Sequence, residues 1–272
     1  YGLVGSEMCI RDSCVATWVC PGGTGVGFPR FAYSKNAEYG YKNLSIFYHG
    51  CTFNCLFCQN WHYREYIGKE EPRTSLELSQ AVDERTSCIC YFGGDPSPQI
   101  LHSIHASRLS LGRKNKKILR LCWETNGTMA SRFLEEILDM ALESGGCVKF
   151  DLKTFDSNLN LALCGRTNEK TKSNFELAAK WTKKRKEPPL VIASTLLVPG
   201  YVEKEEVRRI AGFISSLDPE IPYALLGFYP QFYFHDLPCT SRRHAEECRD
   251  AALEAGLKRV RVGNVHLLGR DY

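Results

Sequence analysis

The sequence predicts an α/β fold in which six consecutive β-α units form a parallel sheet, curved into an open, partial (β/α)6 TIM-type barrel. Past residue 43, short runs rich in β-branched and aromatic residues alternate with amphipathic runs of helical period. Capping signals mark helix ends, and glycine or proline follows several expected strands. No internal repeat and no low-complexity linker interrupts this alternation in the sequence.

The expected strands are mostly apolar, β-branched or aromatic. They are residues 44–48, 87–92, 118–123, 148–152, 191–198 and 223–228, with a peripheral seventh at 258–262. Thr74 and Glu77 form a capping box that opens the first helix, over residues 74–84. Apolar residues share one face in the helices expected over 133–142 and 207–217. The remaining helices are expected over 174–183 and over 241–255, the latter ended by Gly256.

Length and composition fit one compact domain with a sizeable core, because 43% of the 272 residues are apolar and 24% are charged. We expect residues 44–265 to form this domain. Residues 14–43 are then an N-terminal extension, and residues 266–272 are a C-terminal end that we expect to be truncated. Residues 1–13 resemble a translated sequencing-adapter read-through, so we exclude them, Cys9 included, from functional reasoning.

Cysteine content and charge indicate the compartment and the classes of partner. The sequence has 13 cysteines, which is an odd number, and it shows no hydrophobic leader. Both observations favour a reducing compartment and a cytoplasmic location. No run approaches the ~18 apolar residues of a membrane span, so no membrane partner is expected. The net charge of +4 is too mild to predict nucleic-acid binding, and the basic runs at 113–117 and 183–186 are typical of solvated turns.

The most informative motif is Cys51, Cys55 and Cys58, spaced C-x3-C-x2-C after the first expected strand. Three thiolates at this spacing can hold three corners of a four-iron cluster. The fourth iron is then open to a substrate or cofactor, unless a distant cysteine reaches it. The alternative is a set of structural thiols in a cysteine-rich chain. An electron carrier normally has a fourth cysteine at short spacing, and a zinc site a second pair, and neither is present in the sequence.

Polar residues gather where the expected strands end, which is where parallel β/α folds bind ligands. They are Gly93, Gly94 and Asp95, then Glu124 and Asn126, then Asp151 and Lys153. Paired glycines leave backbone groups accessible to an ammonium or carboxylate, although, taken alone, they are better explained by an ordinary turn. Glu124 and Asn126 offer acceptors for ribose hydroxyls, although Asn-Gly is also a common turn dipeptide. Lys153 shares a strand face with Asp151, so either the two form a salt bridge or Lys153 pairs with a ligand carboxylate.

Other cysteines and histidines give weaker signals. Cys14 and Cys20 are either ordinary thiols, which we favour, or ligands of a second metal. For Cys88, Cys90 and Cys122 we favour packing over metal binding. No signal assigns a role to the remaining cysteines, which are Cys147, Cys164, Cys239 and Cys248. Two histidines lie near expected functional loops: His235 would line the substrate mouth, and His49, beside the cysteine loop, would tune the cluster. For both we favour the alternative, a plain surface or core role.

These motifs resemble the radical S-adenosylmethionine (SAM) superfamily over residues 44–265, and within it the pyruvate formate-lyase-activating-enzyme-like (PflA-like) group. The run Gln59-Asn60-Trp61-His62 and the ending 256–264 are nearest to a sister branch often encoded beside Memo-like proteins. Known glycyl-radical activases have His-Asn-Arg-Asp in place of that run. The resemblance implies a partial barrel of the radical SAM type.

The resemblance also implies a set of site residues. Cys51, Cys55 and Cys58 would bind a [4Fe-4S] cluster whose open iron is chelated by SAM. The SAM contacts would be Phe57, Asn60, Gly93, Gly94, Asp95, Glu124, Asn126, Asp151 and Lys153. Among these, Phe57 would lie near the adenine and Gly93 to Asp95 would bind the methionyl ammonium. Asp95 is one methylene shorter than the family's Glu, and Glu124 one longer than its Asp.

The implied reaction is a reductive cleavage of SAM. A reduced flavodoxin or ferredoxin would supply one electron, and the resulting 5′-deoxyadenosyl radical would abstract hydrogen from a substrate, a protein if the chain acts as activases do. No catalytic residue is expected beyond the cluster ligands. One alternative is radical modification of a small molecule or of another protein. The non-enzymatic alternative is a ferredoxin-like electron carrier or a structural metal protein.

Overall fold

The computed structural model describes residues 15–16, 30–34, 38–67, 73–113 and 118–270. The chain divides into two compact units, which we treat separately. The first comprises residues 1–52, 62–149 and 183–190, and the second comprises residues 53–61, 150–182 and 191–272. The predicted boundaries of a 44–265 domain stay a prediction. Cys14, Cys20, most of the 113–117 basic run and the adapter-like segment lie outside the described residues.

The first unit is built on parallel strands. Its strands are β1 (Val15–Ala16), β2 (Glu38–Tyr48), β3 (Thr86–Gly93) and β4 (Arg120–Thr125), followed by β5 (Val148–Asp151), whose last two residues belong to the second unit. Strands β2, β3 and β4 pair in parallel in chain order, whereas β1 pairs antiparallel with β2. The first six residues of β3 are all buried, as expected for a parallel strand covered on both faces.

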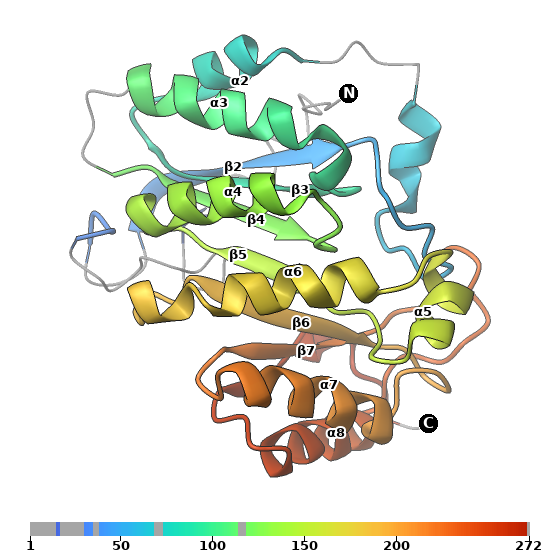
Figure 1. Ribbon diagram of the computed structural model, residues 1–272. Coiled ribbons are helices and arrows are strands. Elements are labelled where there is room, and N and C mark those ends of the chain that lie inside the picture. Colours follow the sequence, from blue (N-terminus) through green and yellow to red (C-terminus); the bar gives the residue numbers. More distant parts are fainter. Residues whose placement is uncertain (1–14, 17–29, 35–37, 68–72, 114–117, 271–272) are drawn as a thin grey trace. The chain divides into compact units, whose positions relative to one another are not determined.

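Helices α2 (Ser75–Ala81), α3 (Ile100–Arg113) and α4 (Ser131–Ser144) lie over these strands (Figure 1). The short helices are η1 (Trp61–Tyr66), which begins at the unit boundary, and η2 (Ser97–Gln99). Helix α2 has the predicted capping box, because the Thr74 side chain accepts from the Glu77 backbone N–H and Glu77 accepts from the Thr74 N–H.

Helix α3 was not predicted, and its buried face explains why. Serines occupy helical positions on that face where apolar residues are usual: Ser103, Ser107 and Ser110 are all buried. The Ser103 hydroxyl accepts from the Trp123 indole N–H at 3.0 Å, and the Ser107 hydroxyl lies 2.8 Å from the Tyr91 hydroxyl. The helix therefore packs on β3 and β4 through hydrogen bonds with large aromatic side chains, which hydrophobic periodicity does not detect.

The second unit repeats the β-α alternation. Its strands β6 (Val191–Leu197), β7 (Tyr223–Gly227) and β8 (Val260–Gly263) pair in parallel in chain order, and β8 is the predicted peripheral strand. Its helices are α5 (Ser157–Cys164), α6 (Glu169–Ala179), α7 (Lys204–Leu217), α8 (Arg242–Glu254) and η4 (Val265–Leu267), with η3 (Thr182–Lys184) beginning at its edge. Helices α7 and α8 lie side by side (Figure 1). The predicted α/β fold with parallel strands is confirmed in both units.

Helix α5 was also not predicted, because eight residues carry too little periodicity to identify. Its ends nevertheless have clear signals. The Asp156 carboxylate accepts from the backbone N–H groups of Asn158 and Leu159 at the amino end. At the carboxyl end Gly165 is left-handed, with φ of 72°. The Asp156 cap and Gly165 therefore define where the helix begins and ends.

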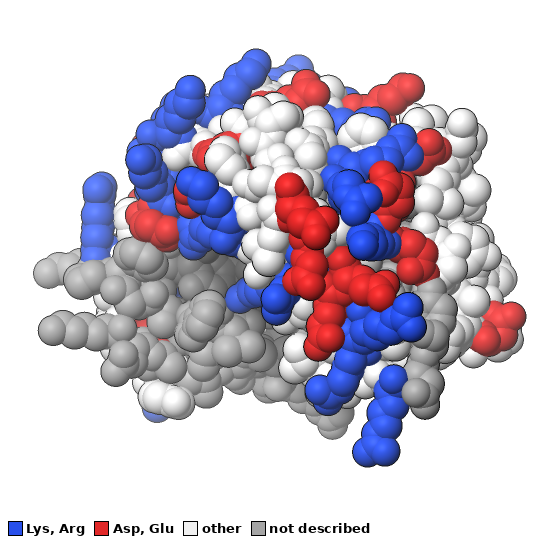
Figure 2. Space-filling view, turned by 90° about the horizontal axis from the view of Figure 1, so that it is seen from below, with Lys and Arg blue, Asp and Glu red and all other residues white. Residues whose placement is uncertain are grey.

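Charged side chains of both signs are interspersed on the face shown in Figure 2. This distribution agrees with the mild net charge of +4. Several ion pairs join exposed residues, among them Arg243 with Glu247 at 2.8 Å and Lys258 with Glu220 at 2.7 Å. Within the described part of the chain, no helix combines the length and the apolar character needed to cross a membrane.

Candidate functional site

The cysteine loop follows β2 and extends from the first unit into the second. Cys51 belongs to the first unit, while Cys55 and Cys58 belong to the second. Cys55 is buried, and the other two are half-buried. We describe the surroundings of each cysteine within its own unit.

In the first unit, Asn126 connects the end of β4 to the start of the cysteine loop. Its amide Nδ2 donates to the Thr52 hydroxyl at 2.7 Å and lies 3.8 Å from the Cys51 sulfur. Thr52 is also 2.6 Å from the Thr128 hydroxyl. Asn126, predicted as a SAM contact, is therefore also a hydrogen-bond donor to the first predicted iron ligand.

Gly93 and Gly94 allow the end of β3 to approach the cysteine loop closely. The Gly94 N–H donates to the Tyr48 carbonyl at 2.9 Å, and the Asp95 N–H donates to the Gly50 carbonyl at 2.7 Å. A Cβ atom on Gly94 would lie 2.4 Å from the Gly50 carbonyl oxygen, so no larger residue fits. The paired glycines thus have a structural reason of their own, in addition to any contact with SAM.

The Asp95 carboxylate is buried and joins the ends of β3 and β4. It accepts from the backbone N–H groups of Ser97 and Asn126, both at 2.6 Å, and its two oxygens each lie 3.2 Å from the Thr125 hydroxyl. Burial raises the pKa of Asp95, although these donors oppose the shift. Asp95 therefore holds the turn that presents Asn126, and its predicted contact with the SAM ammonium stays a prediction.

Glu124, the predicted ribose ligand, forms an ion pair with Lys149 of β5, and both side chains are only 12% exposed. The Cys90 thiol donates to the same carboxylate at 3.6 Å. Sequence reasoning missed Lys149. Because Lys149 lies two residues before Asp151, it shares a strand face with a predicted site residue, and that spacing could have identified it.

In the second unit, Cys55 lies beside the carboxyl end of α5. The Asn54 N–H donates to the Cys164 carbonyl at 2.8 Å, and the Leu56 N–H donates to the Leu163 carbonyl at 2.9 Å. The neighbouring Cys164 thiol and burial raise the pKa of Cys55, and the nearby Lys153 ammonium opposes the shift. Cys164 carried no signal in the sequence.

Asp151 and Lys153 form the salt bridge that the sequence left open, with Nζ and Oδ2 3.0 Å apart. The Ser194 hydroxyl donates to the other Asp151 oxygen. Burial alone would lower the pKa of Lys153, but the Asp151 carboxylate and the cysteine pair of Cys55 and Cys164 raise it. Lys153 therefore stays a cation close to a predicted iron ligand, and its role toward a SAM carboxylate stays a prediction.

Phe57 and Asn60 occupy different environments. Phe57 is 2% exposed, and its ring packs on Phe234, which in turn stacks on Tyr201. Asn60 is exposed. The loop after β7 also reaches the cysteine loop, because the Tyr233 N–H donates to the Leu56 carbonyl at 3.1 Å and the Trp61 ring stacks on Phe232. His235 lies in the same loop and contacts the Phe232 carbonyl.

The other described thiols of the first unit are packed in its interior. Cys88 and Cys122 are buried, with their sulfurs 3.7 Å apart, as expected from packing. The neighbouring Cys122 thiol and burial raise the pKa of Cys147. Among the described residues no three His, Cys, Asp or Glu side chains are grouped to hold a metal ion. A [4Fe-4S] cluster does not need such a group, because each cysteine binds a different iron.

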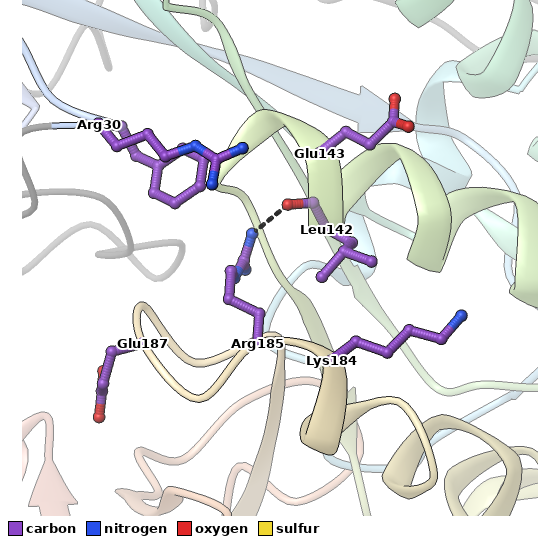
Figure 3. A pocket seen from close by; sticks show the side chains of 7 residues that line it. Arg30, Leu142, Glu143, Lys184, Arg185 and Glu187 are labelled. Carbon is purple, nitrogen blue, oxygen red and sulfur yellow. Dashed lines mark hydrogen bonds between the residues drawn. The ribbon is translucent and has the colours of Figure 1, made fainter.

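A pocket of about 520 Å³ lies in the first unit, at the carboxyl end of α4 (Figure 3). Arg185 lines it, and its guanidinium donates to the carbonyls of Ala141 and Leu142, at 2.9 and 2.7 Å. Figure 3 shows Lys184 and Glu187 pointing away from this guanidinium. Since Arg185 satisfies carbonyls that the end of α4 leaves without helical partners, the pocket is part of a helix cap.

The residues around the cysteine loop fit an iron–sulfur cluster. The loop offers three thiols, which are the donors that iron in such clusters requires. The Asn126 amide at Cys51 and the Lys153 ammonium near Cys55 would stabilise the negative charge of the bound thiolates. The donor set and its surroundings therefore suit iron.

Comparisons with known proteins support the assignment of an iron–sulfur site. The family model of the Radical SAM superfamily matches residues 45–214. "Uncharacterized protein MJ0808" of Methanocaldococcus jannaschii is 25% identical over 229 residues, or 82% of this chain and 63% of that protein, so the chain spans less than two thirds of it. "Putative glycyl-radical enzyme activating enzyme MJ1632" of the same organism is 27% identical over 68% of this chain and 67% of that protein.

A solved structure shows the shared fold. The crystal structure of a radical SAM methyltransferase from Sphaerobacter thermophilus has a TM-score of 0.59 at 13% identity, over 82% of this chain and 67% of that chain. The predicted fold class, an α/β fold of the radical SAM type, is thereby confirmed. Because the family model covers more than half of the sequence, the chain belongs to the radical SAM superfamily of enzymes, which use a [4Fe-4S] cluster and SAM.

Proposed function

We propose that this enzyme uses Cys51, Cys55 and Cys58 to hold its cluster and abstracts hydrogen from a protein substrate, as glycyl-radical-enzyme activases do. When bound, the cluster and SAM supply the 5′-deoxyadenosyl radical that performs the abstraction. Small-molecule chemistry on the same site is the alternative. Since the chain spans 63% of MJ0808, the activity of the whole protein is part of the proposal.

The observation that carries the ligand assignment is the hydrogen bonding of the cysteine loop. Backbone bonds from Gly94 and Asp95 fix the residues just before Cys51, and the Asn126 amide lies 3.8 Å from its sulfur. In the second unit, backbone bonds to α5 fix the residues on either side of Cys55. A loop fixed in this way presents its thiols to iron with little loss of conformational entropy on binding.

We assign the SAM contacts to the residues at the strand ends and in the loop. Lys153 has three N–H donors, one of which serves Asp151, so the ammonium has capacity for the SAM carboxylate. Asp95 and Asn126 act together, because Asp95 fixes the turn from which the Asn126 amide reaches the loop. The further SAM contacts that we propose are Phe57, Asn60, Gly93, Gly94, Glu124 and Asp151.

Two observations support a protein substrate and a protein electron donor. The relative MJ1632, 27% identical, is named a putative glycyl-radical enzyme activating enzyme. The loop after β7 exposes large aromatic side chains beside the cysteine loop, with Tyr229 48% and Tyr233 62% exposed, and exposed aromatics are typical of protein contacts. We propose reduced flavodoxin or ferredoxin as the donor, and a cytoplasmic location.

Anaerobic reconstitution with iron and sulfide tests the ligand assignment. The wild-type protein should bind four irons and, with dithionite and SAM, release 5′-deoxyadenosine. Cys58→Ala should lose both the cluster and the product. Cys239→Ala is the matched control, because Cys239 is also half-buried but lies outside the loop. Cluster and product retained by Cys58→Ala contradict the assignment. Replacement of dithionite by reduced flavodoxin or ferredoxin tests the donor.

Deuterium transfer tests the substrate class. Cells that encode this chain are grown with glycine deuterated at its α-carbon, and their extract is separated into a protein and a low-mass fraction. The reduced enzyme and SAM are added to each fraction, and 5′-deoxyadenosine is analysed by mass spectrometry. Deuterium from the protein fraction supports the activase-like function. Undeuterated product with the protein fraction, or turnover that only the low-mass fraction stimulates, contradicts it.

A further inference from the structure

We propose that Thr128 is a positioning residue for the cluster: its hydroxyl fixes the Asn126 amide so that an N–H group is directed at the Cys51 sulfur, which raises the reduction potential of the cluster. The inference rests on the proposed role of Cys51 as an iron ligand. It concerns a residue to which neither the motifs nor the resemblance assigned a role. The residues involved all belong to the first unit.

Thr128 determines which way the Asn126 amide faces. The Thr128 backbone N–H donates to the Asn126 Oδ1 atom at 3.1 Å, and the Thr128 hydroxyl donates to the same atom at 2.8 Å. A backbone N–H can only donate, so the amide atom opposite it is the oxygen and not the nitrogen. The Nδ2 atom, which carries two N–H groups, therefore faces the cysteine loop.

Three side chains close a ring of hydrogen bonds at this point. The Asn126 Nδ2 atom donates to the Thr52 hydroxyl at 2.7 Å, and the Thr52 and Thr128 hydroxyl oxygens are 2.6 Å apart. Each hydroxyl has one proton. Since that of Thr128 is directed at Asn126 Oδ1, the Thr52 hydroxyl donates to the Thr128 oxygen. Hydrogen bonds arranged head to tail strengthen one another, so the ring resists rotation of the amide.

The backbone of Asn126 is fixed separately from its side chain. Its N–H donates to the buried Asp95 carboxylate at 2.6 Å, and the next N–H, that of Gly127, donates to the Thr125 hydroxyl at 3.0 Å. Asn126 is 4% exposed, so water competes little for its amide. With the backbone held by Asp95, the freedom left to Asn126 is rotation of its side chain, which the ring restricts.

The amide oriented in this way contacts the first predicted iron ligand. One N–H of Nδ2 serves Thr52, and Nδ2 lies 3.8 Å from the Cys51 sulfur. A sulfur that binds iron is a thiolate, which accepts hydrogen bonds. Reduction adds one negative charge, part of which resides on the sulfurs, and a directed N–H stabilises that charge. The competing role is purely structural: Thr128 closes the turn after β4 and does not influence the cluster.

The test is a redox titration of the reconstituted cluster, followed by electron paramagnetic resonance. Thr128→Val removes the hydroxyl but keeps the backbone N–H, so the amide retains part of its orientation. We expect about a threefold lower ratio of reduced to oxidised cluster at a fixed potential, which for a one-electron couple equals a midpoint ~28 mV lower. Thr128→Ser keeps the hydroxyl, and its midpoint should stay close to that of the wild type.

Thr74→Val is the matched control. The Thr74 hydroxyl also takes part in two hydrogen bonds of the first unit, with the backbone N–H and the carboxylate of Glu77, but it caps α2. Its loss should lower stability and leave the midpoint unchanged. An equal shift in Thr74→Val and Thr128→Val would overturn the inference, because the shift would then reflect a general loss of stability.

A double variant separates positioning from a direct effect. Asn126→Ala removes the donor itself, and we expect about a tenfold lower ratio, or a midpoint ~59 mV lower. If Thr128 acts through Asn126, the double variant Asn126→Ala with Thr128→Val has the midpoint of Asn126→Ala alone. Additive shifts overturn the inference, because Thr128 then acts on the cluster without the amide.

Three further results would overturn the inference. A Thr128→Val midpoint equal to that of the wild type leaves Thr128 with the structural role alone. A Thr128→Ser midpoint as low as that of Thr128→Val shows that the hydroxyl is not the cause. Loss of the four-iron cluster from both Thr128→Val and Thr128→Ala does so too, because orientation of a donor is not required for iron binding. A wild-type protein without a four-iron cluster would instead refute the proposed function on which the inference rests.

Discussion

Glu38→Gln should destabilise the first unit strongly, because it leaves the buried Arg120 guanidinium without a charged partner. Glu38 begins β2 and Arg120 begins β4, and their side chains are 0% and 2% exposed. The Arg120 guanidinium donates to both Glu38 oxygens, to the Phe31 carbonyl at 2.6 Å and to the Ser87 hydroxyl at 3.2 Å. The pair lies at the amino ends of the strands, where changes in parallel β/α folds affect stability rather than catalysis.

The expected loss of stability in Glu38→Gln follows from the burial of the ion pair. Breaking a fully buried ion pair by removing one charge costs about 3–5 kcal/mol. Glutamine keeps the shape and one acceptor oxygen, so we expect the lower end of this range, about 3 kcal/mol of the free energy of unfolding. Lys42→Gln on the same strand is the control. Its partner Asp83 is 51% exposed, and breaking such a surface pair costs less than about 1 kcal/mol.

The effect should depend on pH in a defined direction. Burial would raise the pKa of Glu38, but the hydrogen bonds and charge of Arg120 outweigh burial and hold it below its ordinary value of 4.5. A lowered carboxyl pKa contributes stability above that value, and the contribution is lost as pH falls through the folded pKa. The difference between wild type and Glu38→Gln should therefore be smaller at about pH 4 than at about pH 7.

Urea unfolding of the reconstituted protein, followed by circular dichroism, measures these differences. The reasoning is refuted if Glu38→Gln costs no more than Lys42→Gln at neutral pH. It is also refuted if the cost grows as pH falls, because that sign requires a raised carboxyl pKa. A double variant, Glu38→Leu with Arg120→Met, should recover much of the lost stability, since it removes both charges.

Three further predictions concern the site. Gly94→Ala puts a Cβ atom 2.4 Å from the Gly50 carbonyl oxygen and should reduce the iron content after reconstitution, whereas Gly112→Ala, with nothing within 4 Å, should not. Lys153→Ala should weaken SAM binding, measured by equilibrium dialysis, with iron content unchanged; equal SAM affinity would mean that Lys153 serves only its ion pair. Asn126→Ala removes the amide beside the first cysteine and should lower the cluster midpoint in a redox titration, so an unchanged midpoint would contradict its role as a donor.

The sequence identified the strands well because parallel strands buried on both faces are recognisable from composition alone. Helix α3 was missed because serines share its buried face with apolar residues such as Ile100 and Ile104. The aromatic partners of two of these serines lie on strands β3 and β4. Hydrophobic periodicity describes one segment at a time, and the suitability of Ser103 or Ser107 for burial depends on Trp123 and Tyr91. Such a helix becomes recognisable only once its neighbours are known.

The site residues likewise differ in how well the sequence predicts their contacts. Asp151 ends β5 and Lys153 follows it two residues later, so their ion pair is a local contact and was among the predicted alternatives. Glu124 and Lys149 form a similar pair, but they belong to β4 and β5, and their meeting depends on how the two strands align. Sequence alone does not determine this register.

Residues that contact the cysteine loop from distant parts of the chain are the hardest to predict from the sequence. Asn126 was predicted as a SAM contact on the strength of its motif, yet its amide is also directed at Cys51 and Thr52. Cys164 had no motif at all, and its backbone carbonyl accepts from the Asn54 N–H because a short helix ends beside the loop. The spacing of the three cysteines therefore predicts the cofactor, whereas residues at distant strand and helix ends would influence how readily that cofactor accepts an electron. Relatives that share the cysteine spacing but differ at these ends should accordingly differ in reduction potential while binding the same cluster.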